Sequence, residues 1–221
     1  MNTLDKIKSY IFPITVMRTN SPFNPVLEVM LINGNYTLNS EHTNYSQGSL
    51  YSVFEKVFQK LNPDWEKIHD VLILGYGAGS IAEIIVQHKP ACRITGVEID
   101  AKVIEIAERY FKLKEFKNVN VRCSSAQEYM ASCMDSFDLI IIDLFIDKIV
   151  PPEAETEVFL HQVKQALRQG GRVVFNKVTY TRAIKEELPM VTERYKKIFG
   201  NLDLITIMNT GKIFISQKED T

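Results

Sequence analysis

Two hydrophobic periods alternate along the chain from Asp70 onward. Short runs that are mostly apolar indicate strands buried on both faces, and the stretches between them place apolar residues three or four positions apart, as helices do. The runs lie at residues 71–74, 93–99, 119–123, 137–142 and 172–175. We expect Gly170-Gly171 to end the helix before the last run. This alternation predicts a parallel sheet covered on both faces, which is an α/β fold.

The end of the chain follows a different pattern. Residues 202–208 and 213–217 resemble strands, and Asn209-Thr210-Gly211-Lys212 between them is a hairpin signal. A mostly parallel sheet that closes with a C-terminal antiparallel hairpin is the plan of the Rossmann-like methyltransferase fold. Nicotinamide-binding Rossmann domains usually lack that ending, which disfavours a hydride-transfer enzyme.

The first sixty-odd residues show a different pattern of apolar and turn residues from the rest of the chain. Residues 10–40 are rich in β-branched and apolar residues and are interrupted by turn sequences, so we expect a small antiparallel β unit. A helical stripe follows at 49–61, and Asn62-Pro63-Asp64 ends it. We therefore predict an N-terminal β-rich unit with a helix at residues 1–62 and a Rossmann-like domain at 63–221.

Composition and charge argue against several classes of function. The 221 residues are 45% hydrophobic and 24% charged with a net charge of −1, so nothing favours binding to nucleic acid or to an anionic membrane. No apolar run reaches the ~18 residues that span a bilayer. The three cysteines show no CxxC spacing, so we expect reduced thiols in a cytoplasmic protein and no zinc site.

The first candidate site lies in the turn between the predicted strand at residues 71–74 and the helix that follows it. Gly75, Gly77 and Gly79 occupy it, and glycines are needed where a chain turns sharply and a ligand approaches the backbone. The unpaired N–H groups at the start of the helix favour an anionic or carboxylate ligand. Glu98, at the end of the next strand, can accept hydrogen bonds from both hydroxyls of a ribose. We assign these residues to a nucleoside cofactor and Asp100 to the N-cap of the following helix.

These motifs resemble the spermidine synthase (polyamine aminopropyltransferase) family over most of the chain. The similar segments are the β-rich start, Tyr45-Ser46-Gln47 opening a helix, VLILGYGAGS, GVEID, FDLIIIDLFID and the long helix ending in LRQGG. The resemblance implies that the N-terminal β unit packs on the Rossmann-like domain with the active site between them. It also implies that Gln47 lies near the cofactor, that Glu98 holds the ribose and that Asp143 lies at the reacting centre.

The sequence also departs from the family. Ala78 stands where the family usually has an Asp that holds the amine of decarboxylated S-adenosylmethionine, and Ser124-Ser125 replaces a Gly-Asp pair near the adenine. We therefore give Ser125 a lesser part in cofactor binding. The usual Asp-Ser-Ser-Asp becomes Asp143-Leu144-Phe145-Ile146-Asp147. Because a carboxylate at position 78 would repel the carboxylate of intact S-adenosylmethionine, Ala78 favours the intact cofactor, which puts methyl transfer at least on a par with aminopropyl transfer.

Asp143 is the first catalytic candidate. It follows an apolar strand, so its carboxylate emerges at the edge of the sheet where open α/β folds bind ligands. A carboxylate there can attract an acceptor amine, orient it and take its proton, and burial beside apolar neighbours raises its pKa and improves it as a base. The alternative is that Asp143 only caps the backbone of the following loop. Asp147 is the second candidate, and its alternative is an ion pair at the surface.

These residues predict a transferase that uses S-adenosylmethionine (methyl transfer) or its decarboxylated form (aminopropyl transfer) as co-substrate. The acceptor is a small molecule, either an amine such as a polyamine or another small nucleophile. A homodimer is compatible with the β-rich N-terminal unit. No metal is expected as a cofactor.

Other interpretations stay open at this point. Asp143, Asp147 and Asn176 could together bind Mg²⁺, which prefers oxygen ligands. Tyr45 and Tyr180 could line an acceptor pocket or simply pack. A domain that keeps the fold but binds nucleoside weakly could serve as a scaffold or dimerisation module, and the departures at positions 78 and 125 allow this.

Overall fold

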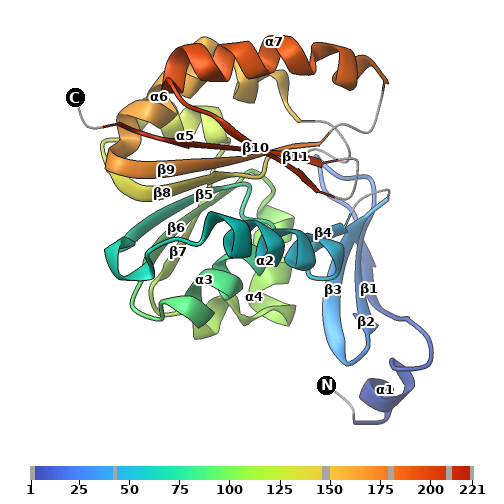
Figure 1. Ribbon diagram of the computed structural model, residues 1–221. Coiled ribbons are helices and arrows are strands. Elements are labelled where there is room, and N and C mark those ends of the chain that lie inside the picture. Colours follow the sequence, from blue (N-terminus) through green and yellow to red (C-terminus); the bar gives the residue numbers. More distant parts are fainter. Residues whose placement is uncertain (1–2, 42–43, 146–149, 179–181, 208–210, 220–221) are drawn as a thin grey trace.

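The computed structural model describes residues 3–41, 44–145, 150–178, 182–207 and 211–219. It contains a four-stranded sheet and a seven-stranded sheet (Figure 1). The small sheet is antiparallel in the order β1-β2-β3-β4 and follows the short helix α1 (Thr3–Lys8). Its strands are β1 (Ile14–Thr19), β2 (Leu27–Ile32), β3 (Asn35–Ser40) and β4 (Asn44–Ser46). The predicted N-terminal β unit is therefore present.

Local sequence explains the β2–β3 hairpin. Asn33 and Gly34 join the two strands with φ of 49° and 77°, which is the left-handed geometry of a two-residue hairpin turn. In β2, buried and partly exposed residues alternate, with Leu27, Val29 and Leu31 inside. This period of two gives the small sheet one apolar face.

The large sheet has the strand order β10-β11-β9-β8-β5-β6-β7. Its strands are β5 (Asp70–Leu74), β6 (Arg93–Glu98), β7 (Val119–Cys123), β8 (Phe137–Ile142), β9 (Leu167–Val178), β10 (Asp203–Ile207) and β11 (Gly211–Gln217). Neighbouring strands from β9 to β7 pair in parallel, and β11 and β10 add an antiparallel hairpin at the β9 edge. The predicted α/β fold with its C-terminal hairpin is confirmed.

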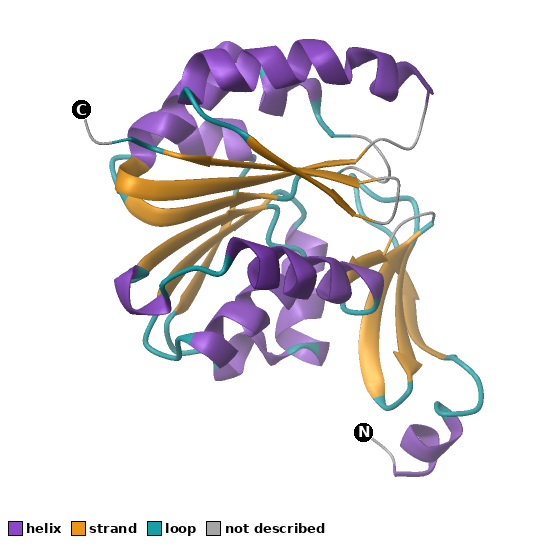
Figure 2. Ribbon diagram, in the orientation of Figure 1, coloured by secondary structure: helices purple, strands orange, loops and turns teal. Residues whose placement is uncertain are grey.

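Helices cover both faces of this sheet (Figure 2). On one face lie α2 (Ser49–Leu61), α3 (Ser80–His88) and α4 (Ala101–Tyr110), and on the other lie α5 (Ala126–Ser132), α6 (Glu157–Ala166) and α7 (Arg182–Phe199). Short 3-10 turns are η1 (Trp65–Lys67), η2 (Lys112–Glu115) and η3 (Pro152–Glu155). Leu72 and Ile140 pack in the core under α5–α7, whereas Ile73 and Ile141 pack in the core under α2 and α3. Strands buried on both faces explain the continuous apolar runs.

The expectation that Gly170-Gly171 ends a helix is wrong. Helix α6 ends at Ala166, and both glycines lie within β9. They form an irregularity where the pairing of β8 with β9 shifts register, and Gly170 has a φ of 72°. A Cβ on Gly171 would lie 2.8 Å from the backbone oxygen of Arg168, so the chain needs a glycine there for steric reasons within the sheet.

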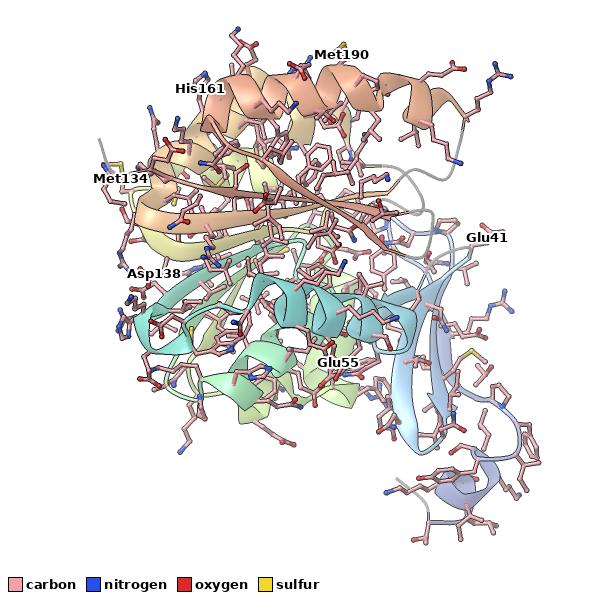
Figure 3. All side chains as sticks on the ribbon, viewed as in Figure 1. Glu41, Glu55, Met134, Asp138, His161 and Met190 are labelled. Carbon is pink, nitrogen blue, oxygen red and sulfur yellow. The ribbon has the colours of Figure 1, made fainter. Side chains whose placement is uncertain are left out.

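Ion pairs fasten the amino-terminal edge of the large sheet. Arg168 bridges Asp70 and Asp138 at 2.7 and 2.8 Å, and Arg93 also pairs with Asp70 at 2.6 Å. Partial burial by itself raises the pKa of Asp70 and of Asp138. Hydrogen bonds from Arg93 and Arg168 hold the pKa of Asp70 below its ordinary range, and those from Arg168 and the backbone N–H groups of Asp70 and His69 do the same for the pKa of Asp138. Figure 3 places Asp138 at the end of the sheet far from the N-terminal unit, so this network is structural.

The N-terminal sheet lies against the opposite, carboxyl-terminal edge. There, residues that follow β5, β6 and β8 meet β4 and the β1–β2 connection. This is the edge where open α/β sheets bind ligands. Within the described residues, no helix combines the length and apolar character needed to cross a membrane.

Candidate active site

The glycine loop joins β5 to α3 at the carboxyl edge. Gly75, Gly77 and Gly79 all have positive φ, at 87°, 56° and 95°. A Cβ on Gly75 would lie 2.1 Å from the backbone oxygen of Asp143, and one on Gly77 would lie 2.9 Å from that of Tyr45. The loop therefore runs between the β8 connection and β4, and only glycine fits the first two positions without displacing backbone.

Glu98 ends β6 and is fixed by the same loop. It is 6% exposed; its Oε2 accepts a hydrogen bond from Gly77 N at 2.9 Å and its Oε1 one from Asp100 N at 3.0 Å. Burial raises the pKa of Glu98, and the backbone hydrogen bonds oppose that rise. The carboxyl is thus held beside the glycine loop by backbone donors, where a ligand with hydroxyl groups could approach it.

Asp143 lies directly after β8 and is paired with a residue of β9. It is 7% exposed, and its Oδ1 accepts a hydrogen bond from Asn176 Nδ2 at 2.9 Å. Burial raises the pKa of Asp143 to about 7, and the nearby charge of Glu98 adds to the rise while Asn176 opposes it. The predicted increase in basicity by burial is therefore present. The two acids and the glycine loop share one small region of the carboxyl edge.

Asn176 is the partner that the sequence analysis considered only as a metal ligand. The register of β8 and β9 pairs Ile142 with Phe175, so the next residue on each strand comes to the same level. The available signal was a polar residue at the end of a strand adjacent to that of Asp143. The sequence alone did not say that the two strands are neighbours with this register.

The structure places Gln47 against α3, and its position near a cofactor stays a prediction. Gln47 has a φ of 62°, its backbone N donates to Ser80 Oγ at 2.6 Å and its Nε2 donates to Glu83 Oε2 at 2.6 Å. The side chain is therefore held against the first turns of α3. A cofactor that contacts the side-chain amide of Gln47 would have to share it with Glu83.

Ser125 is the N-cap of α5. Its Oγ accepts a hydrogen bond from Glu128 N at 3.2 Å, and its backbone N donates one to Glu128 Oε2 at 3.3 Å, which completes a capping box. The hydroxyl also donates to Glu128 Oε2 at 2.9 Å. Both the hydroxyl and the backbone N of Ser125 therefore already have partners within α5. A role for Ser125 in cofactor binding stays a prediction.

Asp147 and Tyr180 lie outside the described residues, so neither the second catalytic candidate nor the magnesium alternative has a geometry here. Of the two other members of the magnesium set, Asn176 donates a hydrogen bond to Asp143. Within the described part of the chain, no three His, Cys, Asp or Glu residues gather as a metal cluster.

A polar network closes the junction with the N-terminal sheet. Asp100 caps α4 as predicted, because its Oδ1 accepts from Lys102 N at 2.9 Å. Its Oδ2 also accepts hydrogen bonds from Ser21 Oγ and from Asn24 Nδ2. Tyr45 Oη lies 3.0 Å from Asn24 Oδ1 and 3.2 Å from the Phe145 oxygen, and its single proton can be donated to either. No local sequence pattern indicates Ser21 and Asn24 as partners, because they lie 79 and 76 residues from Asp100.

This chain is similar in sequence to known transferases. The sequence model of the spermine/spermidine synthase domain matches residues 28–217. A polyamine aminopropyltransferase of Vibrio vulnificus is 31% identical over 142 residues, which cover 63% of this chain and 45% of that protein. An eEF1A lysine and N-terminal methyltransferase homolog of Drosophila pseudoobscura pseudoobscura is 30% identical over 136 residues, covering 57% of this chain and 20% of that protein. The chain thus spans less than half the length of these relatives.

Solved structures share the fold. Spermidine synthase from Thermotoga maritima superposes with a TM-score of 0.72 at 18% identity, over 93% of this chain and 73% of that one. Human methyltransferase-like protein 13 in complex with SAH superposes with a TM-score of 0.62 at 25% identity, over 69% of this chain and 73% of that one. Because the family model spans nearly all of the sequence and a spermidine synthase has the same fold, the chain belongs to the spermine/spermidine synthase domain family.

Proposed function

We propose that this chain transfers a carbon group from S-adenosylmethionine, or from its decarboxylated form, to a small amine. The relatives include polyamine aminopropyltransferases and a lysine and N-terminal methyltransferase homolog. The observation that carries the proposal is the buried carboxyl of Asp143, with a pKa near 7, beside the glycine loop and Glu98. A polyamine is the acceptor class that the aminopropyltransferase relatives favour.

The chemistry requires a base at the acceptor nitrogen. An amine that arrives as an ammonium ion must lose a proton before its lone pair can attack. Asp143 would take that proton; the nitrogen–carbon bond forms as the carbon–sulfur bond breaks, and the sulfur keeps the electron pair and becomes a neutral thioether. A base with a pKa near the working pH suits this step. Asn176 fixes one oxygen of Asp143, and within the described residues no hydrogen bond reaches the other.

The environment of Ala78 supports the intact cofactor as the preferred form. Ala78 is 4% exposed and packs in the apolar cluster that joins the N-terminal sheet to α4, together with Val29, Leu38 and Ile106. The position therefore contributes a methyl group and no charge. A carboxylate there would attract an amine and repel a carboxylate, so its absence favours a cofactor that carries both.

Calorimetric titration of the wild-type chain and Glu98→Gln tests the cofactor. The ligands are S-adenosylmethionine, its decarboxylated form and NAD. We expect the wild type to bind S-adenosylmethionine most tightly, and Glu98→Gln to lose at least tenfold, since charge-assisted hydrogen bonds contribute about 1.5–3 kcal/mol each. Gln keeps an acceptor oxygen for the glycine loop, which makes it a better variant than Ala.

A transfer assay then tests the acceptor side. Wild type and Asp143→Asn are incubated with the preferred cofactor and 1,4-diaminobutane, and the nitrogen-linked product is measured by mass spectrometry. We expect Asp143→Asn to bind the cofactor but to lose at least a hundredfold in transfer rate. Failure of the wild type to bind any of the three cofactors would support a scaffold that has kept the fold.

A further inference from the structure

One hydroxyl group of the N-terminal sheet reaches the chain that follows Asp143. Tyr45 lies in β4, and its Oη is 3.2 Å from the backbone oxygen of Phe145, two residues after the candidate base. The tyrosine is half-buried, and its ring packs against the apolar cluster that contains Leu27 and Ala78. Packing therefore holds the ring, and the ring holds its hydroxyl at the carboxyl edge of the large sheet.

A buried amide orients this hydroxyl. Asn24 is 2% exposed, and its Nδ2 lies 2.9 Å from Asp100 Oδ2. Because a carboxylate accepts hydrogen bonds and does not donate them, the amide must turn its nitrogen toward Asp100 and its oxygen toward Tyr45. Tyr45 Oη lies 3.0 Å from that oxygen and can only donate to it. The hydroxyl thus serves as a donor between the oxygens of Asn24 and Phe145.

These contacts connect the two acids of the candidate site through the N-terminal unit. Asp100 donates its backbone N to Glu98 Oε1 at 3.0 Å, and its side chain accepts from Asn24. From Asn24 the hydrogen bonds continue through Tyr45 to the chain after Asp143. The position of the chain after Asp143 relative to Glu98 therefore depends on side chains that the N-terminal unit supplies.

We propose that Tyr45 is a positioning residue, whose hydroxyl holds the chain after Asp143 where the Asp143 carboxyl can reach the acceptor. The inference rests on the proposed function, in which Asp143 takes a proton from the acceptor nitrogen. A general base works only within hydrogen-bond reach of that proton, and a displacement of about 1 Å can cost a factor of about 100 in rate. This role differs from the wall of an acceptor pocket and from simple packing, the two roles that the sequence left open.

Tyr45→Phe tests the proposal, because it removes the hydroxyl and keeps the ring in its apolar cluster. Tyr36→Phe is the matched control, since Tyr36 lies in the neighbouring strand β3, packs against the same cluster and contacts Tyr110 edge-on. Amide hydrogen exchange of the wild type and both variants is measured first, without ligand. We expect exchange at residues 143–145 to accelerate about threefold or more in Tyr45→Phe, as the loss of one hydrogen bond allows, and to keep the wild-type rate in Tyr36→Phe.

Transfer kinetics then separate positioning from acceptor binding. The assay uses a saturating concentration of the cofactor that binds more tightly, S-adenosylmethionine or its decarboxylated form, and varies 1,4-diaminobutane. We expect Tyr45→Phe to lower kcat about tenfold or more and to leave KM for the diamine within about twofold of the wild type. Tyr36→Phe should keep both constants.

Three results would overturn the proposal. Exchange at residues 143–145 that stays at the wild-type rate in Tyr45→Phe would show that the hydroxyl does not hold this chain. An unchanged kcat would show that holding it has no effect on the reaction, and a raised KM with an unchanged kcat would make Tyr45 part of the acceptor site. A wild type that transfers nothing, with exchange still faster in Tyr45→Phe, would sink the proposed function and uphold the contact of Tyr45 with the chain after Asp143.

Discussion

Glu98 and Asp143 place two carboxyl groups in one buried region, and the charge of Glu98 makes ionisation of Asp143 more difficult. Asp143 is the clearer case, because burial and the charge of Glu98 raise its pKa to about 7. A carboxyl whose pKa in the folded chain exceeds its unfolded value of about 3.9 binds an additional proton on folding between these two values. The free energy of unfolding therefore falls as pH rises from about 4 to about 7. A sulfonium cofactor would favour the ionised form, so its affinity should rise with pH over the same range.

The variant Asp143→Asn removes this titration. We expect it to be more stable than the wild type at pH 8, with an advantage that grows between pH 5 and pH 7 and is level above. Each kcal/mol of added free energy of unfolding should raise the melting temperature by about 2–4 °C in a chain of this length. Thermal melts across this pH range measure the effect, and Asp203→Asn at an exposed position is the control. A variant that is less stable than the wild type at pH 8 would show that the ionised Asp143 carboxylate does not destabilise the folded chain.

At the scale of elements, a buried ion pair joins β9 to the turn before α6. Lys177 and Glu155 have side chains only 5% and 11% exposed, and Arg194 Nη1 donates to the Glu155 backbone oxygen at 2.5 Å. Lys177 follows Asn176, so the pair fixes the end of β9 next to the partner of Asp143. Removing charges from water is costly, and the pair recovers that cost only while both members are present.

Lys177→Met should therefore cost about 3–5 kcal/mol, since it leaves the Glu155 carboxylate buried without its cation. The double variant Lys177→Met with Glu155→Met should regain most of that loss, because the two apolar side chains can pack together. Urea unfolding of the wild type, the single variant and the double variant gives the comparison. A double variant as unstable as the single one would show that the charge of Glu155 is not the cause.

At the scale of the whole molecule, Asp100 couples the N-terminal sheet to the Rossmann-like domain. It is 2% exposed, caps α4 and accepts hydrogen bonds from Ser21 and Asn24 of the β1–β2 connection. The same residue donates its backbone N to Glu98. Because one residue serves both sides of the junction, the placement of the N-terminal sheet and the geometry of the cofactor acid depend on each other. A homodimer, a cytoplasmic location and a domain boundary at residue 62 stay predictions.

Asp100→Ala should cost about 2–4 kcal/mol, which combines a lost N-cap with lost hydrogen bonds to a buried charge. Amide hydrogen exchange should also accelerate in β1–β3, far along the sequence from the substitution. Asp64→Ala removes the cap of η1, an exposed carboxylate that accepts from Glu66 N and pairs with Lys67, and is the control. Exchange that accelerates in α4 alone would mean that Asp100 does not couple the two parts.

The sequence by itself determined the order of strands and helices, the terminal hairpin and the glycine loop with its acid. These features are local: a buried strand needs a continuous apolar run, and a turn with positive φ needs glycine. The cap at Asp100 was predictable for the same reason, since a cap requires only the next three residues. The family resemblance followed from such local motifs.

Only the tertiary structure decided which side chains meet across elements. The bond from Asn176 to Asp143 spans 33 residues and depends on the register of β8 and β9, which apolar runs do not specify. Gly170 and Gly171 entered a strand because the edge hairpin pairs with them, as Gly170 N donates to Lys218 O. The side chain of Gln47 contacts Glu83, and Ala78 packs between the N-terminal sheet and α4, because packing of the N-terminal unit placed them there. Contacts of this kind arise from the folded arrangement, and no local pattern encodes them.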